Sequence, residues 1–289
     1  MKRNILTLII AVFALTQAAA QTYDNLWKQA DIIARKDQPK SEIGVMKKII
    51  SKASAAKDYG QLMAAEMRQM ILWKEISADS LTPNVERMEA EVLKVKDPAV
   101  KAVRYAVLGK VYRDMDEKKS QEFFKKALEQ PELLAKHTST EYVPLTLKGV
   151  DGSSFNNDLL HLIGFEADSK EAYHLMYTYY NKVENRGAAC LCAYKLIEKY
   201  RQDDVREVKK SKYLHTIDSL IHVYQDIPEA GELAVEHFRF MEGATDAKPL
   251  DKLNYINYAL SRWGGWSRMN ELRNAQKRLT EPMFQVKDM

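Results

Sequence analysis

Hydrophobic residues recur every three or four positions along most of the chain, the spacing that places them on one face of an α-helix. After Pro39, for example, the pattern places Ile43, Met46 and Ile49 on one face, with lysines between them. A proline in the first helical turn is tolerated because its missing N–H would be unpaired there. The pattern predicts an all-α protein whose helices are joined by short connections.

The same periodicity predicts further helices between breaks at prolines, glycines and polar clusters. The expected helices cover about residues 23–34, 39–56, 62–73 and 85–95, a pair within 99–131, and then 158–163, 173–180, 188–200, 205–224, 229–241, 250–263 and 267–279. Glycine, serine and threonine gather between 138 and 154, where residues 142–147 are expected to be extended. A long irregular connection of this kind is typical of a functional loop or a boundary.

The stretch from Ala99 to Pro131 carries the most informative motif. It resembles the tetratricopeptide repeat, in which a Trp-x2-Leu-Gly-x2-Tyr helix is followed by an Ala-x3-Phe-x2-Ala helix and a proline. The matching residues are Tyr105, Leu108, Gly109, Tyr112, Phe124, Ala127 and Pro131, with Ser120 in the place of the first alanine and a turn one residue shorter. We expect Gly109 to allow close approach of the helices, Phe124 to fill the space between them, and Pro131 to end the second helix.

Weaker hairpins at 22–56 and 60–96 extend this motif into a tetratricopeptide-like α-solenoid of stacked antiparallel helical hairpins in two halves. The expected organisation is a signal peptide at 1–20, N-terminal helical-hairpin repeats at 21–131, an irregular connection at 132–157, a C-terminal helical half at 158–280 and an extended exit at 281–289.

The first twenty residues have the composition of a secretory signal peptide. Lys2 and Arg3 precede an apolar run from Ile5 to Leu15, and three alanines lead to Gln21. The run is shorter than the roughly 20 residues of a membrane-spanning helix. We therefore expect cleavage near Ala20–Gln21, export to the periplasm or cell envelope, and no membrane span after cleavage. No cysteine follows the alanines, so a lipid anchor is not expected, and an uncleaved N-terminal anchor is the alternative.

Composition narrows the class of protein. The chain has 11 glycines and 8 prolines in 289 residues, 46% hydrophobic residues and 29% charged residues. These values exclude collagen-like, disordered and polytopic membrane proteins and disfavour an all-β fold. Lysine and arginine number 44 against 40 acidic residues, and the two signs are interspersed. A mixed surface of this kind is not the basic stripe that nucleic-acid binding requires.

Neither the cysteines nor the histidines form a recognisable reactive motif. Cys190 and Cys192 lie two residues apart in an expected helix, where they face different sides and cannot form a disulfide with each other. We expect both to fill the core. His215 and His222, seven residues apart, can share a helix face, which is more typical of surface residues than of metal ligands. No phosphate-binding loop, nucleophile elbow or metalloprotease pair occurs, so no catalytic residue, cofactor or metal is expected.

Two groups of residues can be interpreted either as functional or as structural. Asp158 and His161, with Glu166 close in sequence, could form an acid–base cluster, although a capping aspartate and a packed histidine are the favoured interpretation.

The second group is aromatic. Tyr173, Tyr177 and Tyr180 form a stripe, and Trp263 and Trp266 flank Gly264-Gly265. Such rings could stack on a sugar, but helical repeats use them more often to pack helices.

The order of several segments resembles the N-terminal helical region of the very large alpha-2-macroglobulin-like proteins of Bacteroidota-type bacteria. The segments are Tyr23–Trp27, Asp37–Lys40, Ala55–Leu62, Phe123–Leu128, Tyr142–Leu145, Asn157–His161 and Pro282–Phe284. The resemblance implies a cell-envelope protein of protease-inhibitor type, in which β-sandwich domains follow the helical region. The reactive Cys-x-x-Gln thioester of some family members has no counterpart here, since Cys190 and Cys192 lack the glutamine.

Three functional hypotheses follow. The first is a non-enzymatic exported helical-repeat scaffold or binding module, the N-terminal part of an alpha-2-macroglobulin-like protein, whose partner is a protein, a peptide or the following β-sandwich domains. The second is a stand-alone periplasmic adaptor or glycan-binding protein. The third is a helical carbohydrate-active enzyme with Asp158 or Glu166 as the acid.

Overall fold

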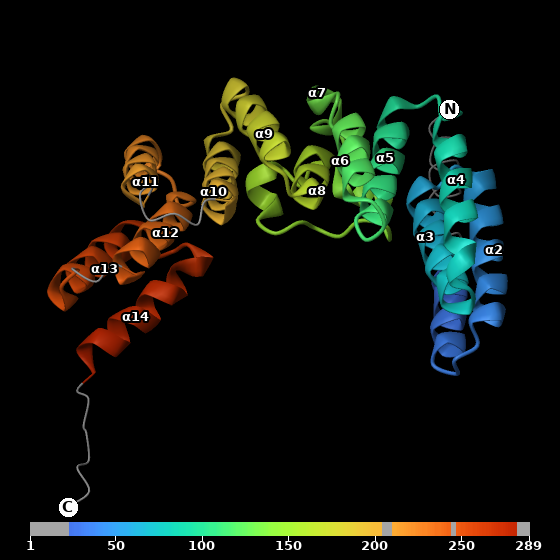
Figure 1. The fold of residues 1–289 in the computed structure, drawn as a ribbon, viewed down its shortest axis with the longest axis horizontal. Helices are drawn as coiled ribbons and strands as arrows, with labels where there is room; N and C mark the ends of the chain where they lie inside the picture. The colour runs from blue at the N-terminus through green and yellow to red at the C-terminus, as the bar shows by residue number, and fades with distance from the viewer. Residues whose placement is uncertain (1–22, 204–209, 244–246, 282–289) are drawn as a thin grey trace, which may run out of the picture. The chain divides into compact units, whose positions relative to one another are not determined.

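The computed structural model describes residues 23–203, 210–243 and 247–281, and helices account for most of them (Figure 1). Within this part of the chain there is no β-strand, and an isolated bridge joins Thr138 to Asp158. The expected all-α helical-repeat fold is confirmed. The expected signal peptide (1–20) and residues 282–289 of the expected exit lie outside the described residues.

Contacts between residues divide the chain into two units. Unit 1 contains the described residues up to Val150 together with Asn157–Ala167, and unit 2 contains Asp151–Asn156 and the described residues from Asp168 onward.

Consecutive helices pair within each unit. Unit 1 begins with a helix over residues 23–34, followed by α2 (Pro39–Ala56), α3 (Tyr59–Ile76), η1 (Ala78–Ser80), α4 (Leu81–Val92), α5 (Pro98–Tyr112), α6 (Glu117–Ala127), α7 (Pro131–Leu134), η2 (Ser139–Tyr142) and α8 (Leu159–Ala167). Its closest pairs are α2 with α3 and α5 with α6.

Unit 2 contains η3 (Gly152–Phe155), α9 (Lys170–Lys182), α10 (Arg186–Asp203), α11 (Lys210–Tyr224), α12 (Ala230–Gly243), α13 (Pro249–Trp263), η5 (Ser267–Met269) and α14 (Asn270–Thr280). Here α9 pairs with α10, α11 with α12, and α13 with α14.

Prolines and aspartates set where several helices begin. Pro39 and Pro249 each start a helix, as the sequence predicts, and Pro98, expected as a helix boundary, is the first residue of α5. The Asp97 carboxylate accepts the N–H groups of Ala99 and Val100 at 2.9 and 3.0 Å, which caps α5. Such a cap satisfies backbone donors that have no partner inside the helix.

The α5–α6 hairpin explains the tetratricopeptide-like motif. A Cβ atom on Gly109 would lie 2.8 Å from Cδ2 of Phe124, so only glycine fits beneath that ring. The Ser120 hydroxyl, in the motif's alanine position, donates a buried hydrogen bond of 2.7 Å to the Gly109 carbonyl. Leu108, Phe124 and Ala127 are each 1% exposed. The motif therefore describes a close helix crossing in which a serine hydroxymethyl group stands where the repeat has an alanine methyl group.

The other motif positions are partly as expected. Tyr112 is 5% exposed, and Phe123 stacks between its ring and that of Tyr105, with ring centres 5.4 and 6.1 Å away. Pro131 does not end the second helix, because α6 already ends at Ala127 and Pro131 is the first residue of α7.

The expected connection at 132–157 is more ordered than the sequence suggests. It contains most of α7 and the 3₁₀ turns η2 and η3, and residues 142–147 form turn and coil rather than an extended segment. The backbone of Tyr142 and Val143 lies so close to Gly60 that a Cβ there would come within 2.5 Å of it. This close approach fixes the segment against the start of α3.

The boundary between the units also differs from the expected one. The expectation assigns 158–167 to the C-terminal half, but α8 packs against α5, α6 and α7 and belongs to unit 1. Leu159 and Leu160 are buried in this packing.

Two helices begin elsewhere than expected. Helix α4 covers 81–92 rather than 85–95, since Pro83 is accommodated in its first turn. The expected helix over 205–224 is observed from Lys210, and residues 204–209 lie outside the described part.

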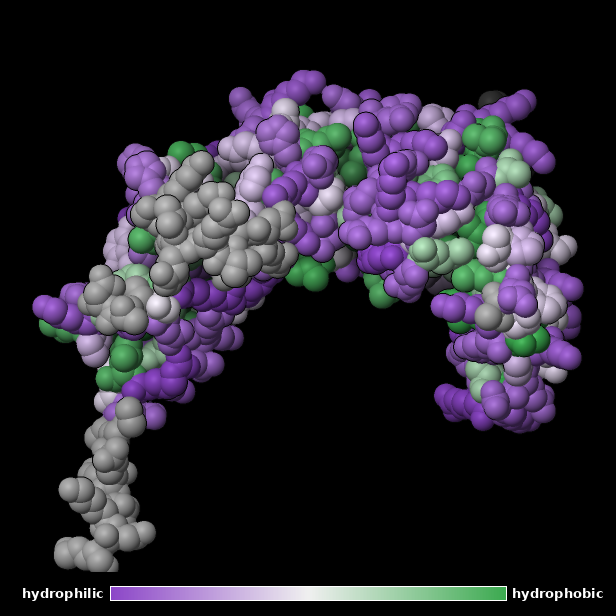
Figure 2. All heavy atoms as spheres, in the orientation of Figure 1, coloured by the Kyte–Doolittle hydropathy of each residue, from purple (hydrophilic) through white to green (hydrophobic). Residues whose placement is uncertain are grey.

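Hydrophilic side chains cover most of the face seen in Figure 2, and apolar ones are scattered among them. Leu147, Leu93 and Val150 are among the most exposed apolar residues. None of the described helices has both the length and the apolar character needed to cross a membrane.

Candidate functional site

The residues that the sequence suggested for acid–base chemistry cap a helix, pack in the core or form ion pairs. An Asp158 carboxylate oxygen accepts the His161 N–H at 2.8 Å and so caps α8. The His161 ring is fully buried, with its centre 4.5 Å from that of Phe165, and burial lowers its pKa to about 4. Glu166 forms ion pairs with Lys110 at 3.2 Å and Arg113 at 3.0 Å. The capping interpretation is confirmed for Asp158.

Both cysteines are fully buried in α10, and no disulfide joins them. Burial, the largest cause, raises the pKa of Cys190 far above its usual value. A buried thiol of this kind is unreactive. Cys190 and Cys192 therefore fill the core, as expected.

Most of the aromatic residues considered for sugar stacking are committed to packing. Tyr173 and Tyr180 are buried, and Tyr177 is half-buried. The Trp263 indole donates to the Gln225 carbonyl at 3.1 Å, and the Trp266 ring lies against Gly231. His215 and His222 are exposed on α11. Within the described residues, no three histidine, cysteine, aspartate or glutamate side chains gather as a metal site.

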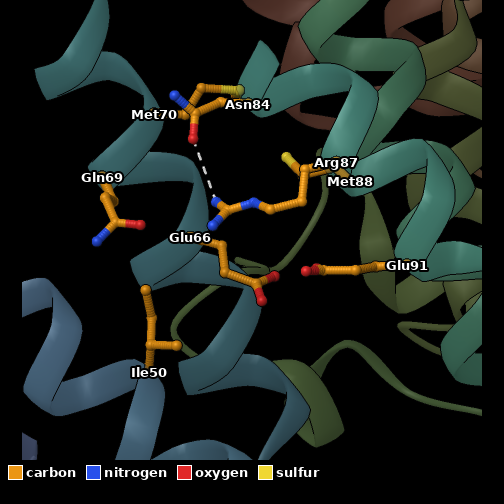
Figure 3. A pocket seen from close by; sticks show the side chains of 8 residues that line it. All are labelled: Ile50, Glu66, Gln69, Met70, Asn84, Arg87, Met88 and Glu91. Atoms are coloured by element: carbon orange, nitrogen blue, oxygen red, sulfur yellow. Dashed lines mark hydrogen bonds between the residues drawn. The ribbon is translucent and has the colours of Figure 1, made fainter. Parts of the chain in front are cut away.

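A pocket that the sequence did not predict lies in unit 1, between α3 and α4 (Figure 3). Its volume is about 100 Å³. The lining residues are Ile50 of α2, Glu66, Gln69 and Met70 of α3, and Asn84, Arg87, Met88 and Glu91 of α4. We call this space the α3–α4 pocket.

The lining residues recur at helical spacing, which explains why they meet. Glu66, Gln69 and Met70 lie at i, i+3 and i+4 of α3, and Asn84, Arg87, Met88 and Glu91 lie at i, i+3, i+4 and i+7 of α4. Residues at these spacings share one helix face. Each face mixes methionine with charged and amide groups, which is the signal that could have revealed the pocket.

Two carboxylates face each other across the pocket. Figure 3 shows the Glu66 and Glu91 side chains pointing toward one another from the two helices. Glu66 pairs with the buried Arg104 of α5 at 3.1 Å, and the Glu91 side chain has no ion pair with any described residue. Burial raises the pKa of Glu66 and the charge of Glu91 raises it further, whereas Arg104 and Arg87 oppose this rise.

The polar side chains around the two carboxylates differ in whether they have a hydrogen-bond partner. The Arg87 guanidinium donates to the Asn84 side-chain oxygen at 3.2 Å. Gln69 is only 6% exposed, and its side-chain amide makes no hydrogen bond with the described residues.

Two wider hollows also open in unit 1. One, of about 280 Å³, lies among α5, α6 and α7 and includes Lys101, Tyr105 and Lys126. The other, of about 490 Å³, includes Asp58, Asp97 and the 137–143 segment. In the second hollow His137 pairs with Glu141 at 2.7 Å, and burial raises the pKa of Tyr142 to about 12.

Comparisons with known proteins place the chain in no family. No family model matches it, and none of the curated proteins matches it either. Among solved structures, the crystal structure of BtubC (BKLC) from P. vanneervenii matches with 11% identity and a TM-score of 0.32, over 87% of this chain and 97% of that chain. A likeness of this size carries no inference about fold or function.

Proposed function

We propose that the chain is a non-enzymatic, exported helical-repeat module that binds a peptide or another protein domain. One observation carries the proposal. Successive helices of unit 1 leave hollows lined by charged, amide and apolar side chains, in reach of solvent. Helical-repeat proteins bind extended segments on surfaces of this kind.

The roles of the candidate catalytic groups support a binding function over chemistry. Asp158 caps a helix, Glu166 is neutralised by two cations, and the thiols are buried. The exposed groups that remain around the hollows are suited to recognition through charge and hydrogen bonds.

Selection of peptides tests the binding proposal. The chain from Gln21 onward is used to select peptides from a random display library, and affinities of enriched peptides are measured by fluorescence anisotropy. Lys126 lines the smaller of the two wider hollows and Lys57 lines the larger. Charge reversal there, in Lys126→Glu and Lys57→Glu, should weaken binding at least about fivefold in one variant or the other. Lys277→Glu, on the exposed side of α14, is the matched control. Failure to enrich any peptide, or equal binding by all three variants, contradicts the proposal.

We further propose that the chain is the N-terminal part of an alpha-2-macroglobulin-like envelope protein. The order of segments from Tyr23 to Phe284 supports this assignment. Two measurements test it. Mass spectrometry of the protein made in its own cells should find Gln21 at the N-terminus, and the downstream or neighbouring reading frame should encode β-sandwich domains. An intact N-terminal segment contradicts export by cleavage, and a locus without such domains contradicts the family assignment.

A further inference from the structure

We infer that the hollow among α5, α6 and α7 binds an acidic side chain, glutamate or aspartate, of an extended partner segment. We call this space the α5–α7 hollow, and the lining residues that bear on its ligand are Lys101, Ala102 and Tyr105 of α5, Lys126 of α6 and Leu133 of α7. The inference rests on the proposed binding function and assigns a specific chemistry to one of its surfaces.

Two cations line the hollow without an acidic partner. Lys101 follows Asp97 by four residues and Lys126 follows Glu122 by four, a spacing at which side chains on a helix can form ion pairs. Neither lysine forms an ion pair with any described residue. Asp97 instead accepts the first N–H groups of α5. Both positive charges therefore remain open to a carboxylate from a partner.

Aromatic rings hold one of these charges in place. The ammonium nitrogen of Lys126 lies 5.1 Å from the ring centre of Phe123 and 5.8 Å from that of Tyr105, within the range of cation–π attraction. An ammonium group has three N–H donors, and those of Lys126 make no hydrogen bond with a described residue. Because the rings already order this side chain, a carboxylate that binds it pays less in lost rotamer entropy.

Tyr105 adds a donor of a second kind. Its side chain is half-buried in the hollow, and its hydroxyl makes no hydrogen bond with a described residue. An ionised carboxylate has only acceptor sites, about four of them on its two oxygens. Two ammonium groups and a phenol, presented by two helices, supply the donors that such a group requires.

The remaining walls suit a short side chain with an apolar stem. Ala102 is buried and Leu133 is half-buried, so methylene groups of glutamate or aspartate have apolar surface to lie against. The hollow has a volume of about 280 Å³, whereas one water occupies roughly 30 Å³ in the liquid. A whole acidic side chain with part of its backbone therefore fits.

The balance of charge favours an acidic partner over a basic one. Glu129 is the acidic residue of the lining, and it is exposed and forms no ion pair with a described residue. Lys101 and Lys126 outweigh it, so the lining is net positive. A lysine or arginine from the partner would meet repulsion from two of the three charged groups, whereas a carboxylate would be attracted by the same two.

A leucine in the hollow makes a direct test available. The chain from Gln21 onward, with ¹³C-labelled leucine methyl groups, is titrated with the peptide acetyl-Gly-Leu-Glu-Glu-Leu-Gly-amide and with its counterpart that has two glutamines in place of the glutamates. Leu133→Met assigns the signal of the hollow, and Leu250→Met assigns a control signal from an exposed residue of α13. We expect the glutamate peptide to shift the Leu133 signal saturably and to leave the Leu250 signal unchanged, and the glutamine peptide to shift neither.

Matched variants identify the groups responsible. Lys126→Gln should weaken binding of the glutamate peptide about fivefold, the upper range for an exposed charge pair. Lys125→Gln, the exposed neighbour on α6 that does not line the hollow, changes the net charge equally and should leave binding unchanged. Tyr105→Phe keeps the ring and should weaken binding about threefold through the lost hydrogen bond. Circular dichroism confirms that the three variants are folded.

Several outcomes overturn the inference. Equal shifts with the glutamine peptide would show an apolar hollow only, and equal losses in Lys125→Gln and Lys126→Gln would show attraction by general charge. Tighter binding of the glutamine peptide with a free carboxyl terminus would assign the hollow to a chain end, and saturation by inorganic phosphate without a response to the glutamate peptide would assign it to a phosphate group. If the glutamate peptide fails while a display-selected peptide still binds, the inference fails and the binding function stands.

Discussion

Unit 1 and unit 2 each hold a glutamate between helices, and the two glutamates differ in their hydrogen-bond and ion-pair partners. Glu232 of unit 2 accepts hydrogen bonds from the Trp266 indole at 2.5 Å and from Arg268 at 2.8 Å. Glu66 of unit 1 pairs with Arg104 and faces the carboxylate of Glu91 across an open pocket. Burial is the largest cause of a raised pKa at both glutamates.

The difference lies in how completely each glutamate is paired by the groups around it. Arg268 also binds Asp151 at 2.5 Å, so a single cation joins η3, η5 and α12 into one closed network. In unit 1 Glu66 is paired with Arg104 alone, and the neighbouring Glu91 has no ion pair with any described residue. A buried polar network stabilises the fold when every member has a partner, and an incomplete one costs stability unless a ligand completes it.

The largest effect is expected from Arg268→Met. The variant leaves Glu232, which is 2% exposed, and the half-buried Asp151 without their cation. Removal of one partner of a buried ion pair costs about 3 kcal/mol or more. Urea unfolding measures the loss, and Arg262→Met on the exposed side of α13 should cost less than about 0.5 kcal/mol. Equal losses in the two variants would mean that the unit 2 network does not contribute to stability.

Packing at the α5–α6 crossing should have the next largest effect. Gly109→Ala brings a methyl group against the Phe124 ring, and overpacking of this kind costs about 1–3 kcal/mol. Gly44→Ala in α2 is the matched control, because nothing lies within 4 Å of the added Cβ. The control should gain up to about 1 kcal/mol from the helix preference of alanine. A gain in both variants would contradict the close crossing.

The pH dependence of Glu66 should be smaller and has a defined sign. Its pKa is raised in the folded state, so its contribution to stability is fully present below the ordinary value of 4.5 and is lost as pH rises through the folded pKa. The free energy of unfolding of the wild type should therefore fall relative to Glu66→Gln as pH rises. The trend should weaken in a Glu91→Gln background, where one cause of the shift is removed. A free energy of unfolding of the wild type that rises relative to Glu66→Gln with increasing pH would contradict this sign.

The smallest effect should come from Glu91→Gln alone. Without a ligand, removal of the repulsion from Glu66 should stabilise unit 1 by a few tenths of a kcal/mol, about the size of an exposed charge interaction. The gain should shrink at about 1 M salt, where the Debye length is roughly 3 Å. Denaturant midpoints at low and high salt measure it. A clear loss of stability would show that Glu91 already has a favourable role in the free protein.

Most of the fold could be predicted from the sequence, because local rules govern it. Hydrophobic spacing identified the helices, and Pro39, Pro98 and Pro249 marked where three of them begin. Pro83 was misleading because a proline within the first turn does not end a helix. The position of α8 could not be predicted, since only tertiary packing assigns it to unit 1.

The pocket was harder to predict than the fold. Glu66 and Glu91 are 25 residues apart in sequence and meet only because α3 and α4 present mixed faces to one space. The interspersed charges were interpreted as a solvated surface. That interpretation does not distinguish a carboxylate without an ion pair from the paired carboxylates around it. The periodicity of the sequence identifies which residues share a helix face. It does not reveal which face of another helix packs opposite them.

The chain path between the units restricts how the protein can be divided. Unit 1 is interrupted at residues 151–156, which belong to unit 2, and resumes until Ala167. A fragment that ends at Val150 lacks α8. A fragment that begins at Asp168 lacks Phe155, whose ring centre lies 5.3 Å from that of Tyr180, and it also lacks Asp151, the ion-pair partner of Arg268. If the protein is split into fragments 1–167 and 168–289, residues 151–156 are on the first fragment although they belong to unit 2. A second copy of residues 151–156 must therefore be added to the C-terminal fragment.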